Sequence, residues 1–158
     1  MQIRRTQAAD LDVLVAIENT VFPSDRMSRR SLQRSISSPT MTMLTAVSEG
    51  TPVGYALVHR RRGSKIAHLA SIAVGRDTAS GANSCGVLRQ TRLATCVRLE
   101  VRSDNSVARH LYGFAGYQIT ATLDDYYEDG TSAVRYEKVL ARRSGARASK
   151  PERPHLTR

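Results

Sequence analysis

The hydrophobic positions in the first part of the chain predict one strand followed by two helices. Residues 2–6 alternate between polar and apolar side chains, which is typical of a short strand. Asp10 opens an amphipathic helix that Pro23 stops, because proline cannot continue the helical hydrogen-bond pattern. Ser28 can cap a second helix, which ends before Pro39. The apolar side chains of the first helix recur every three or four positions, at Leu11, Leu14, Ile17 and Val21.

Strand patterns dominate the rest of the chain. Two apolar runs, 41–47 and 53–58, flank the turn residues Glu-Gly-Thr-Pro at 49–52 and predict a hairpin. Because hairpins and helical crossovers both occur, the sequence predicts an α/β fold with a mixed sheet, in one domain over residues 1–140. The later elements are expected as strands 66–74 and 97–102, helix 106–115, and strands 117–122 and 133–140.

Length and cysteine usage narrow the possible classes of protein. A chain of 158 residues is long enough to bury one core without disulfides. It contains no run of about 18 apolar residues, and its amino terminus lacks the apolar stretch of a secretory signal. Cys85 and Cys96 are the only cysteines, and neither they nor the scattered histidines have metal-ligand spacing. We therefore expect a reduced, cytoplasmic protein with no metal ion and no membrane contact.

The formal net charge of +10 is concentrated at the carboxyl terminus. Residues 141–158 contain six lysine and arginine residues against one glutamate, so this segment supplies half of the surplus. It has almost no large apolar side chain, and we expect a disordered basic tail. Such a tail can contact RNA or ribosomes weakly through phosphates, or it can simply keep the protein soluble.

The most specific stretch of the sequence runs from Val97 to Tyr117. It contains Leu-Glu-Val-Arg at 99–102, Asp-Asn at 104–105, Leu-Tyr at 111–112 and Gly-Tyr at 116–117. These motifs closely resemble the second half of GNAT-superfamily acyltransferases, most of all the bacterial ribosomal-protein-alanine N-acetyltransferases. The order of elements matches as well, so the resemblance covers roughly residues 2–140. It implies a GNAT-like mixed β-sheet flanked by about four helices.

The resemblance also implies an activity and the residues for it. It implies transfer of an acetyl group from acetyl-coenzyme A (acetyl-CoA) to a primary amine, by direct attack in a ternary complex. Glu100 stands at the position of the family's general base, Tyr112 at that of the tyrosine that protonates the leaving thiolate, and Asn105 beside the pantetheine arm. From the residues alone, Glu100 could instead pair with Arg98 or Arg102 on an exposed sheet face, and Tyr112 could be a core aromatic.

The expected cofactor segment departs from the family pattern. By resemblance, the pantetheine lies along the backbone of Ile72, Ala73 and Val74. The pyrophosphate loop that follows usually reads Arg/Gln-x-x-Gly-x-Gly/Ala, and this chain departs from it at the defining positions. Small, turn-tolerant residues can still present backbone amides to phosphate. The residues expected to do so are consecutive: Ala79, Ser80, Gly81, Ala82, Asn83 and Ser84.

The same region is shorter than in family members and leaves room for a helix of only about three turns, over residues 86–95. Two explanations are open. Residues 75–96 could derive from a locally shifted reading frame, or the loop could be a divergent one that still binds phosphate. The altered loop and the basic tail motivate an alternative function, a catalytically weak or inactive GNAT-fold binding module.

Two further segments are candidates for the acceptor groove. In similar acetylases a tyrosine pair borders this groove, and Tyr126 and Tyr127 match it. Four carboxylates surround the pair and would attract a cationic protein amino terminus or a lysine, although an ordinary solvated turn has the same composition. By the same resemblance, the loop of residues 22–27, which begins with Phe22, forms the other wall. We therefore expect the acceptor to be a primary amine, most of all a protein amino terminus.

Overall fold

The structure is a computed structural model, and it describes residues 1–75 and 94–140. Its centre is a seven-stranded sheet with the strand order β1-β2-β3-β4-β5-β7-β6. Strands β4 and β5 run parallel, whereas every other neighbouring pair is antiparallel. The elements are β1 (Gln2–Arg5), a short 3₁₀ turn (Ala8–Asp10), α1 (Leu11–Val21), α2 (Arg29–Ser37), β2 (Met41–Ser48), β3 (Thr51–His59), β4 (Ile66–Val74), β5 (Cys96–Arg102), α4 (Ser106–Phe114), β6 (Gln118–Leu123) and β7 (Ala133–Val139).

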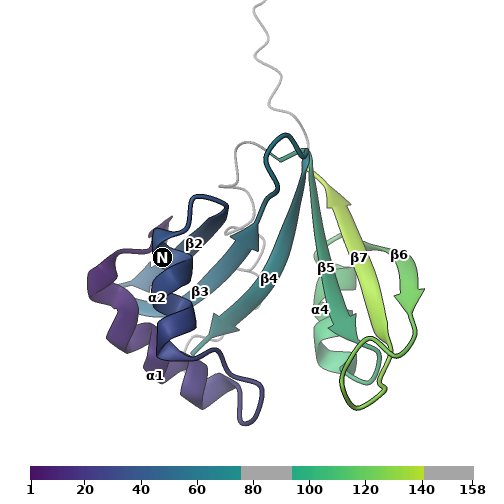
Figure 1. Ribbon diagram of the computed structural model, residues 1–158, viewed down its shortest axis with the longest axis horizontal. Helices are drawn as coiled ribbons and strands as arrows, with labels where there is room; N and C mark the ends of the chain where they lie inside the picture. The colour runs from purple at the N-terminus through teal and green to yellow at the C-terminus, as the bar shows by residue number, and fades with distance from the viewer. Residues whose placement is uncertain (76–93, 141–158) are drawn as a thin grey trace, which may run out of the picture.

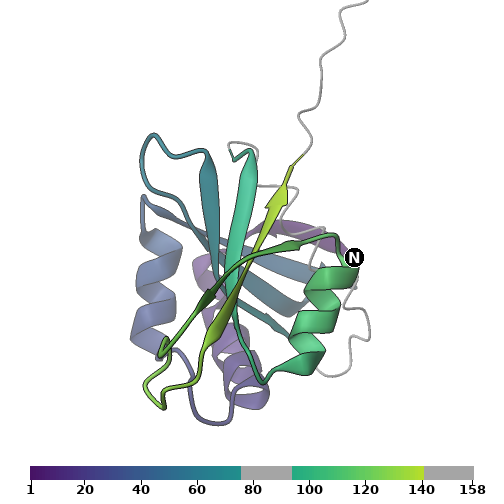
Figure 2. The same cartoon turned by 90° about the vertical axis from the view of Figure 1, so that its right-hand side faces the viewer.

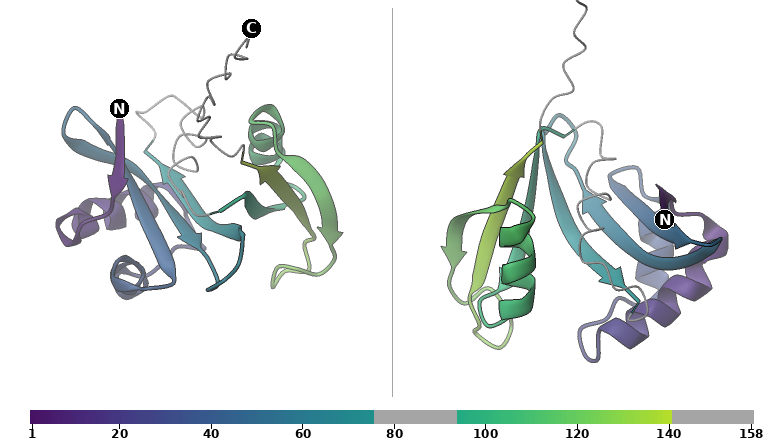
Figure 3. Two further views of the ribbon diagram at one scale, coloured as in Figure 1. Left: turned by 90° about the horizontal axis from the view of Figure 1, so that it is seen from above. Right: turned by 180° about the vertical axis from the view of Figure 1, so that it is seen from behind.

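The sheet is split into two halves that meet at one end of β4 and β5. Figure 1 shows these two strands close together at the top of the view and far apart at the bottom, like the arms of a V. The views from above and from behind in Figure 3 show the same separation. The hairpin loop after β6 and the loop between α1 and α2 both lie at the open end of the V, and the turn between β3 and β4 lies at the closed end.

The helices cover opposite faces of the sheet, which Figure 2 shows edge-on. Helices α1 and α2 pack on one face, where their apolar stripe meets alternate residues of β2, β3 and β4. The core on the other face contains Tyr112 of α4 together with the intervening residues of the same strands and with residues of β5 and β7. Because successive side chains of a strand point to opposite faces, both cores draw on the same strands. This arrangement confirms the expected mixed α/β sheet and GNAT-like architecture.

Local sequence signals explain where the helices begin. The Ser28 side chain caps α2 by accepting a hydrogen bond from the amide of Ser31, as its position in the sequence predicts. Pro39 lies just beyond the end of α2. The helix expected from Asp10 begins one residue later, at Leu11, because Asp10 is the last residue of a 3₁₀ turn.

Two expected boundaries differ from the structure. The hairpin turn between β2 and β3 consists of Glu49 and Gly50 alone, both with positive φ, and Pro52 is already paired with Val47. A two-residue turn of this kind matches the right-handed twist of the strands it joins. The sequence predicts a helix up to about residue 95, but residues 94 and 95 are not helical, and the Thr95 amide donates to the Lys65 carbonyl (2.8 Å) on the approach to β5. The rest of the predicted helix lies outside the described residues.

Candidate active site

The candidate site lies where β4 and β5 separate. Their parallel pairing joins only three residue pairs, of which His68 with Arg98 is the last. From Leu69 to Val74, β4 continues along β3 and has no partner in β5. A strand edge without a partner presents unpaired N–H and C=O groups. The open side of β4 can therefore form backbone hydrogen bonds with an extended ligand that enters between the strands.

A β-bulge in β4 changes which residues face the two sides of the sheet at this point. Leu57 pairs with Ser71 while Val58 pairs with Leu69, so that Ala70 is an extra residue in the ladder. Bulges of this type redirect the side chains that follow them. Ser71 consequently lies on the face covered by α1 and α2, where its hydroxyl is 3.1 Å from the hydroxyl of Tyr55.

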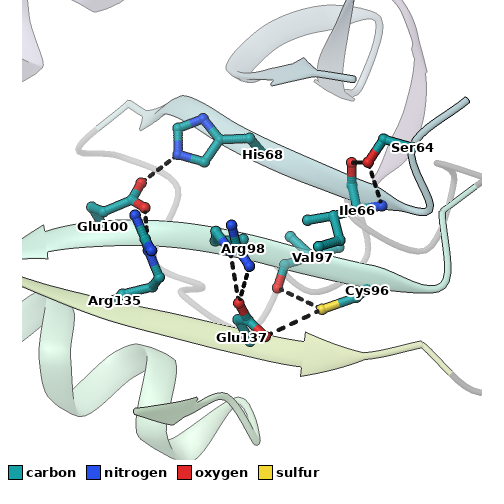
Figure 4. A network of polar contacts seen from close by, with 9 residues as sticks. All are labelled: Ser64, Ile66, His68, Cys96, Val97, Arg98, Glu100, Arg135 and Glu137. Atoms are coloured by element: carbon teal, nitrogen blue, oxygen red, sulfur yellow. Dashed lines mark hydrogen bonds and ion pairs between the residues drawn. The ribbon is translucent and has the colours of Figure 1, made fainter. Parts of the chain in front are cut away.

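Glu100 forms the centre of a charged cluster on that same face (Figure 4). Its Oε2 contacts Nε2 of His68 on β4, and its Oε1 accepts a hydrogen bond from Nε of Arg135 on β7, at 2.9 Å. The carboxylate side chain is only 6% exposed, whereas the His68 side chain is 38% exposed. The cluster therefore joins three strands across the closed end of the V, and His68 is its accessible member.

Arg98 and Arg102, the partners that the sequence suggests for Glu100, form ion pairs with other carboxylates. Arg98 pairs with Glu137 at 2.6 Å, and Arg102 pairs with Asp104 and Asp129. Burial raises the pKa of Glu100, but the hydrogen bonds from His68 and Arg135 outweigh it, and the pKa lies below its ordinary value. Glu100 is therefore ionised at neutral pH.

Tyr112 lies on the opposite side of β5. It is 7% exposed and belongs to the core beneath α4, together with Leu99 and Val101. Its ring is 5.5 Å from that of Tyr117, edge to face, and 6.2 Å from that of Tyr136. Glu100 alternates with Leu99 and Val101 along the strand, so its carboxylate points away from this core. The two residues proposed for proton transfer thus flank β5 from opposite faces.

Asn105 caps the amino terminus of α4. Its side-chain oxygen accepts a hydrogen bond from the Ala108 amide at 3.0 Å, which satisfies one of the free donors at the start of the helix. The residue itself is exposed and follows directly after the end of β5. Asn105 therefore fixes the entry into the helix on which Tyr112 lies, and within residues 1–75 and 94–140 its side-chain N–H₂ group has no hydrogen-bond partner.

The tyrosine pair lies in the loop between β6 and β7, at the open end of the V. The rings of Tyr126 and Tyr127 pack edge to face at 5.1 Å, and the Arg102 guanidinium lies 4.9 Å from the centre of the Tyr127 ring. Burial, followed by the charge of the nearby Glu100 carboxylate, raises the pKa of Tyr126. Tyr126 therefore lies within electrostatic reach of the Glu100 carboxylate.

Arg102 also determines which carboxylates of this loop remain free. It donates from Nη2 to Asp129 at 2.7 Å and to the Thr131 hydroxyl at 2.8 Å. The hydrogen bond from Arg102 is the main cause that lowers the pKa of Asp129. Asp124, Asp125 and Glu128 are exposed and have no ion-pair partner among the described residues. These three carboxylates, rather than all four, are available to attract a cation.

A buried carboxylate fixes the loop between α1 and α2. Glu18 on α1 is 1% exposed, and its Oε1 accepts a hydrogen bond from the Met27 amide at 2.6 Å. Its Oε2 accepts a hydrogen bond from the Tyr55 hydroxyl, which also contacts Ser71. Phe22 is partly buried against the core beneath α1. The loop is thereby connected through Glu18 and Tyr55 to the bulged part of β4.

Comparisons with known proteins agree with this geometry. The family model described as an acetyltransferase (GNAT) domain matches residues 7–140. This chain belongs to the GNAT acetyltransferase family. The expected resemblance is therefore confirmed. Among curated proteins, an uncharacterized N-acetyltransferase of Methanocaldococcus jannaschii is 29% identical over 141 residues, which are 85% of this chain and 88% of the relative.

Solved structures of GNAT proteins share the fold. The ribosomal-protein-S18-alanine N-acetyltransferase of Escherichia coli superposes with a TM-score of 0.73 at 20% identity, over 90% of this chain and 97% of that one. An aminoglycoside 6'-acetyltransferase of type Ii superposes with a TM-score of 0.75 at 14% identity, over 88% and 97% of the two chains. At this level of identity the likeness shows the fold, and two differently named enzymes match it equally well.

Part of the cofactor segment expected in a GNAT protein lies outside the described residues. This holds for every residue of the proposed pyrophosphate loop, Ala79, Ser80, Gly81, Ala82, Asn83 and Ser84. Ile72, Ala73 and Val74 are described and form the last part of β4, beside β3. Over residues 1–75 and 94–140, no group of histidine, cysteine, aspartate and glutamate side chains is arranged to hold a metal ion. Within the same ranges no helix is both long and apolar enough to cross a bilayer.

Several residues of the site have no signal in the motif. Four of these residues come from strands whose register places them at the site, and the sequence identifies them only as strand residues. They are His68, Arg135, Tyr55 and Ser71. Glu18 has a recognisable signal, since a carboxylate four residues after Leu14 falls on the apolar face of α1. A charged side chain at such a position predicts a buried hydrogen-bonding partner.

Proposed function

We propose that this GNAT protein transfers an acetyl group from acetyl-CoA to a primary amine, most of all the amino terminus of a protein. The observation that supports this most is the separation of β4 and β5 immediately beside the Glu100–His68 pair. Acetyl-CoA, when bound, supplies a thioester carbon for attack and a thiolate as leaving group. Direct attack in a ternary complex needs only that the chain holds both reactants and moves two protons.

The described residues fit this substrate. Among the described strands, the backbone of Ile72, Ala73 and Val74 has no partner on the side of β5, which suits it to the amides of a pantetheine arm. The Asn105 side-chain N–H₂ group is a further donor at the start of α4. In the same proposal, the amides of residues 79–84 hold the pyrophosphate.

The Glu100–His68 pair takes the proton of the attacking amine. Glu100 alone would be a weak base, because its pKa lies below the ordinary value. Hydrogen-bonded to it, His68 is the more exposed partner and can release the proton to solvent. Imidazole suits this task because a neutral ring carries one nitrogen that can accept a proton. Glu100 then orients the imidazole.

Tyr112 protonates the leaving thiolate from the other side of β5. A phenol with an ordinary pKa of about 10 can transfer a proton to a thiolate of comparable basicity. Glu100 and Tyr112 lie on opposite faces of β5. Both can therefore reach one thioester only beyond the edge of β5, on the side where β4 has diverged. The proposal therefore assigns the reacting carbon to the gap between β4 and β5.

The acceptor groove in this proposal is bordered by Phe22, Tyr126 and Tyr127. Asp125 and Glu128 supply negative charge near the tyrosines and favour a cationic amine. The Escherichia coli enzyme of the same fold is named for an alanine of ribosomal protein S18, which supports a protein amino terminus as acceptor. The aminoglycoside enzyme shares the fold as well, so a small amine is the alternative within the same chemistry.

A second candidate is a GNAT-fold binding module with little or no activity. It is favoured by the departure of residues 79–84 from the usual pyrophosphate loop and by the basic residues 141–158, which could contact RNA or ribosomes. Either function is proposed for the cytoplasm, where the free thiol of Cys96 stays reduced. Residues 1–140 form the domain and 141–158 the tail in both proposals.

Release of free coenzyme A distinguishes the two candidates. The purified protein is mixed with acetyl-CoA and short peptides that present alanine, serine or methionine at a free amino terminus, and the thiol is measured by colorimetry. Glu100→Gln and Tyr112→Phe should each lower turnover by about a hundredfold or more. Matched controls are Glu137→Gln, another strand carboxylate paired with arginine, and Tyr136→Phe in the same core as Tyr112. Equal activity in Glu100→Gln and Glu137→Gln would refute the assignment.

A further inference from the structure

The positive charge of the chain is concentrated in two segments. Residues 26–75 contain eight lysine and arginine residues against Glu49 alone, a net charge of +7. Residues 141–158 add a net charge of +5. Because the whole chain has a net charge of +10, the remaining residues together have a slightly negative net charge. The first of these segments comprises α2 and the turn between β3 and β4, both of which the structure describes.

The segment that follows helix α2 is hydrogen-bonded to the beginning of this turn. The Arg60 amide donates to the Thr40 carbonyl at 3.1 Å, and Thr40 follows shortly after the carboxyl end of α2. On the helix, Arg30 and Arg34 are exposed and line a shallow hollow of about 540 Å³ together with Gln33 and Ser37. We call Arg30, Arg34, Arg61, Arg62 and Lys65, all of them exposed, the basic surface.

The basic surface is not neutralised by neighbouring carboxylates. Within residues 1–75 and 94–140, none of its five side chains forms an ion pair. By contrast, Arg4, Arg29 and Arg98 each have an acidic partner. Unpaired charges of one sign on one part of a molecule create a field that attracts polyanions.

The basic tail begins beside this surface. The Leu140 amide donates to the Thr95 carbonyl at 2.8 Å, and the Thr95 amide donates to the Lys65 carbonyl at 2.8 Å. The six basic residues of 141–158 therefore follow in sequence from a point next to the turn. The turn between β3 and β4 lies at the closed end of the V in Figure 1, away from the hairpin loop after β6. Arg30, at the amino end of α2, follows shortly after the loop of residues 22–27.

We propose that the basic surface binds the phosphate backbone of duplex RNA. Its cations are mostly arginine, whose planar guanidinium matches phosphate oxygens in a bidentate manner. The described part of α2 and of the turn has no exposed aromatic side chain on which a single strand could stack, and no large exposed apolar side chain to insert into a bilayer. The choice of RNA over DNA rests on the proposed acceptor, a protein amino terminus of the ribosomal class.

Binding of a fluorescently labelled RNA hairpin to the full-length chain, measured by anisotropy, tests this inference. Arg34→Glu and Arg62→Glu should each weaken binding by about tenfold at low salt and reduce the slope of log K against log salt by about 1. Arg5→Glu is the matched control, because Arg5 is an exposed arginine on β1 outside the basic surface. Thermal unfolding of each variant establishes that it is folded.

Three results would overturn the inference: an equal loss of affinity in Arg5→Glu, equal affinity for a DNA hairpin of the same sequence, or tighter binding to vesicles of anionic lipid.

The coenzyme A release assay keeps this test separate from the proposed function. Arg34→Glu should retain full turnover with peptide acceptors. An inactive protein that binds RNA would refute the transferase, whereas an active protein that does not bind RNA would refute only the basic surface.

Discussion

Replacement of Glu18 by alanine measures how strongly the loop between α1 and α2 is held. The carboxylate accepts hydrogen bonds from the Met27 amide and from the Tyr55 hydroxyl. Hydrogen bonds to a charged group contribute about 1.5–3 kcal/mol each, but burial of the carboxylate is itself unfavourable and its removal recovers part of this. Tyr55 keeps its contact with Ser71. We therefore expect the free energy of unfolding to fall by about 2–3 kcal/mol.

Urea denaturation gives this value directly, and thermal unfolding should show a melting temperature lower by about 4–12 °C. Asn19→Ala is the matched control, since Asn19 is the next residue of the same helix, is exposed, and accepts a longer hydrogen bond (3.4 Å) from Arg26 of the same loop. Its effect should stay within about 0.5 kcal/mol. If Glu18→Ala were no more destabilising than Asn19→Ala, the proposed anchoring of the loop would be wrong.

A double-mutant cycle separates the Glu18–Tyr55 contact from general loss of packing. Tyr55→Phe removes the hydroxyl and keeps the ring in its buried position. If the two side chains are directly hydrogen-bonded, the loss of unfolding free energy in the double mutant should differ from the sum of the two single-mutant losses by about 0.5–3 kcal/mol. Strict additivity would contradict a direct hydrogen bond.

Three further predictions concern the site and the charge pairs. His68→Asn should lower turnover by about tenfold or more without changing acetyl-CoA affinity, whereas a change in affinity alone would exclude His68 from proton transfer. The hydrogen bond from Arg4 lowers the pKa of Asp10, so the ion pair stabilises the folded state above the ordinary pKa of 3.8. This stabilisation is lost as the pH falls below that value. In acid denaturation, Asp10→Asn should therefore lose stability less steeply than the unmodified protein below about pH 4. Arg102→Ala should change stability little, because its ion pairs lie at the surface, yet raise the Michaelis constant for a peptide acceptor through the loosened tyrosine loop. An unchanged Michaelis constant would refute this function of Arg102.

The order of elements follows from the sequence because the apolar periods are intact on both sides of residues 76–93. The strand over Ile66–Val74 is confirmed with its bounds, and the cap at Ser28 is confirmed with its hydrogen bond. The predicted hairpin turn is too long, because it includes Pro52, which is paired with Val47 in the strand ladder. Proline is tolerated in a strand where its missing N–H is not required for the ladder, and the register shift between Ala46 and Val47 provides such a place.

The charged cluster could not be predicted in the same way. The contact of His68 with Glu100 depends on the parallel register of β4 and β5, which a crossover sets and no local motif encodes. The pairing of Glu100 with Arg135 likewise depends on the register of β5 with β7. The sequence indicated Arg98 and Arg102 because they are close along the chain, but both have nearer carboxylates in space. The assignments of proton transfer to Glu100 and Tyr112 stay predictions until they are measured.

Thermal unfolding with and without millimolar acetyl-CoA tests the central claim most directly, because a chain that transfers the acetyl group must first bind its donor. At 100 times the dissociation constant, binding to the folded state adds about 2.7 kcal/mol, which corresponds to about 5–11 °C for a domain of this size. We predict a clear upward shift that saturates with concentration. No shift at any concentration would contradict the proposed acetyltransferase and favour the binding module.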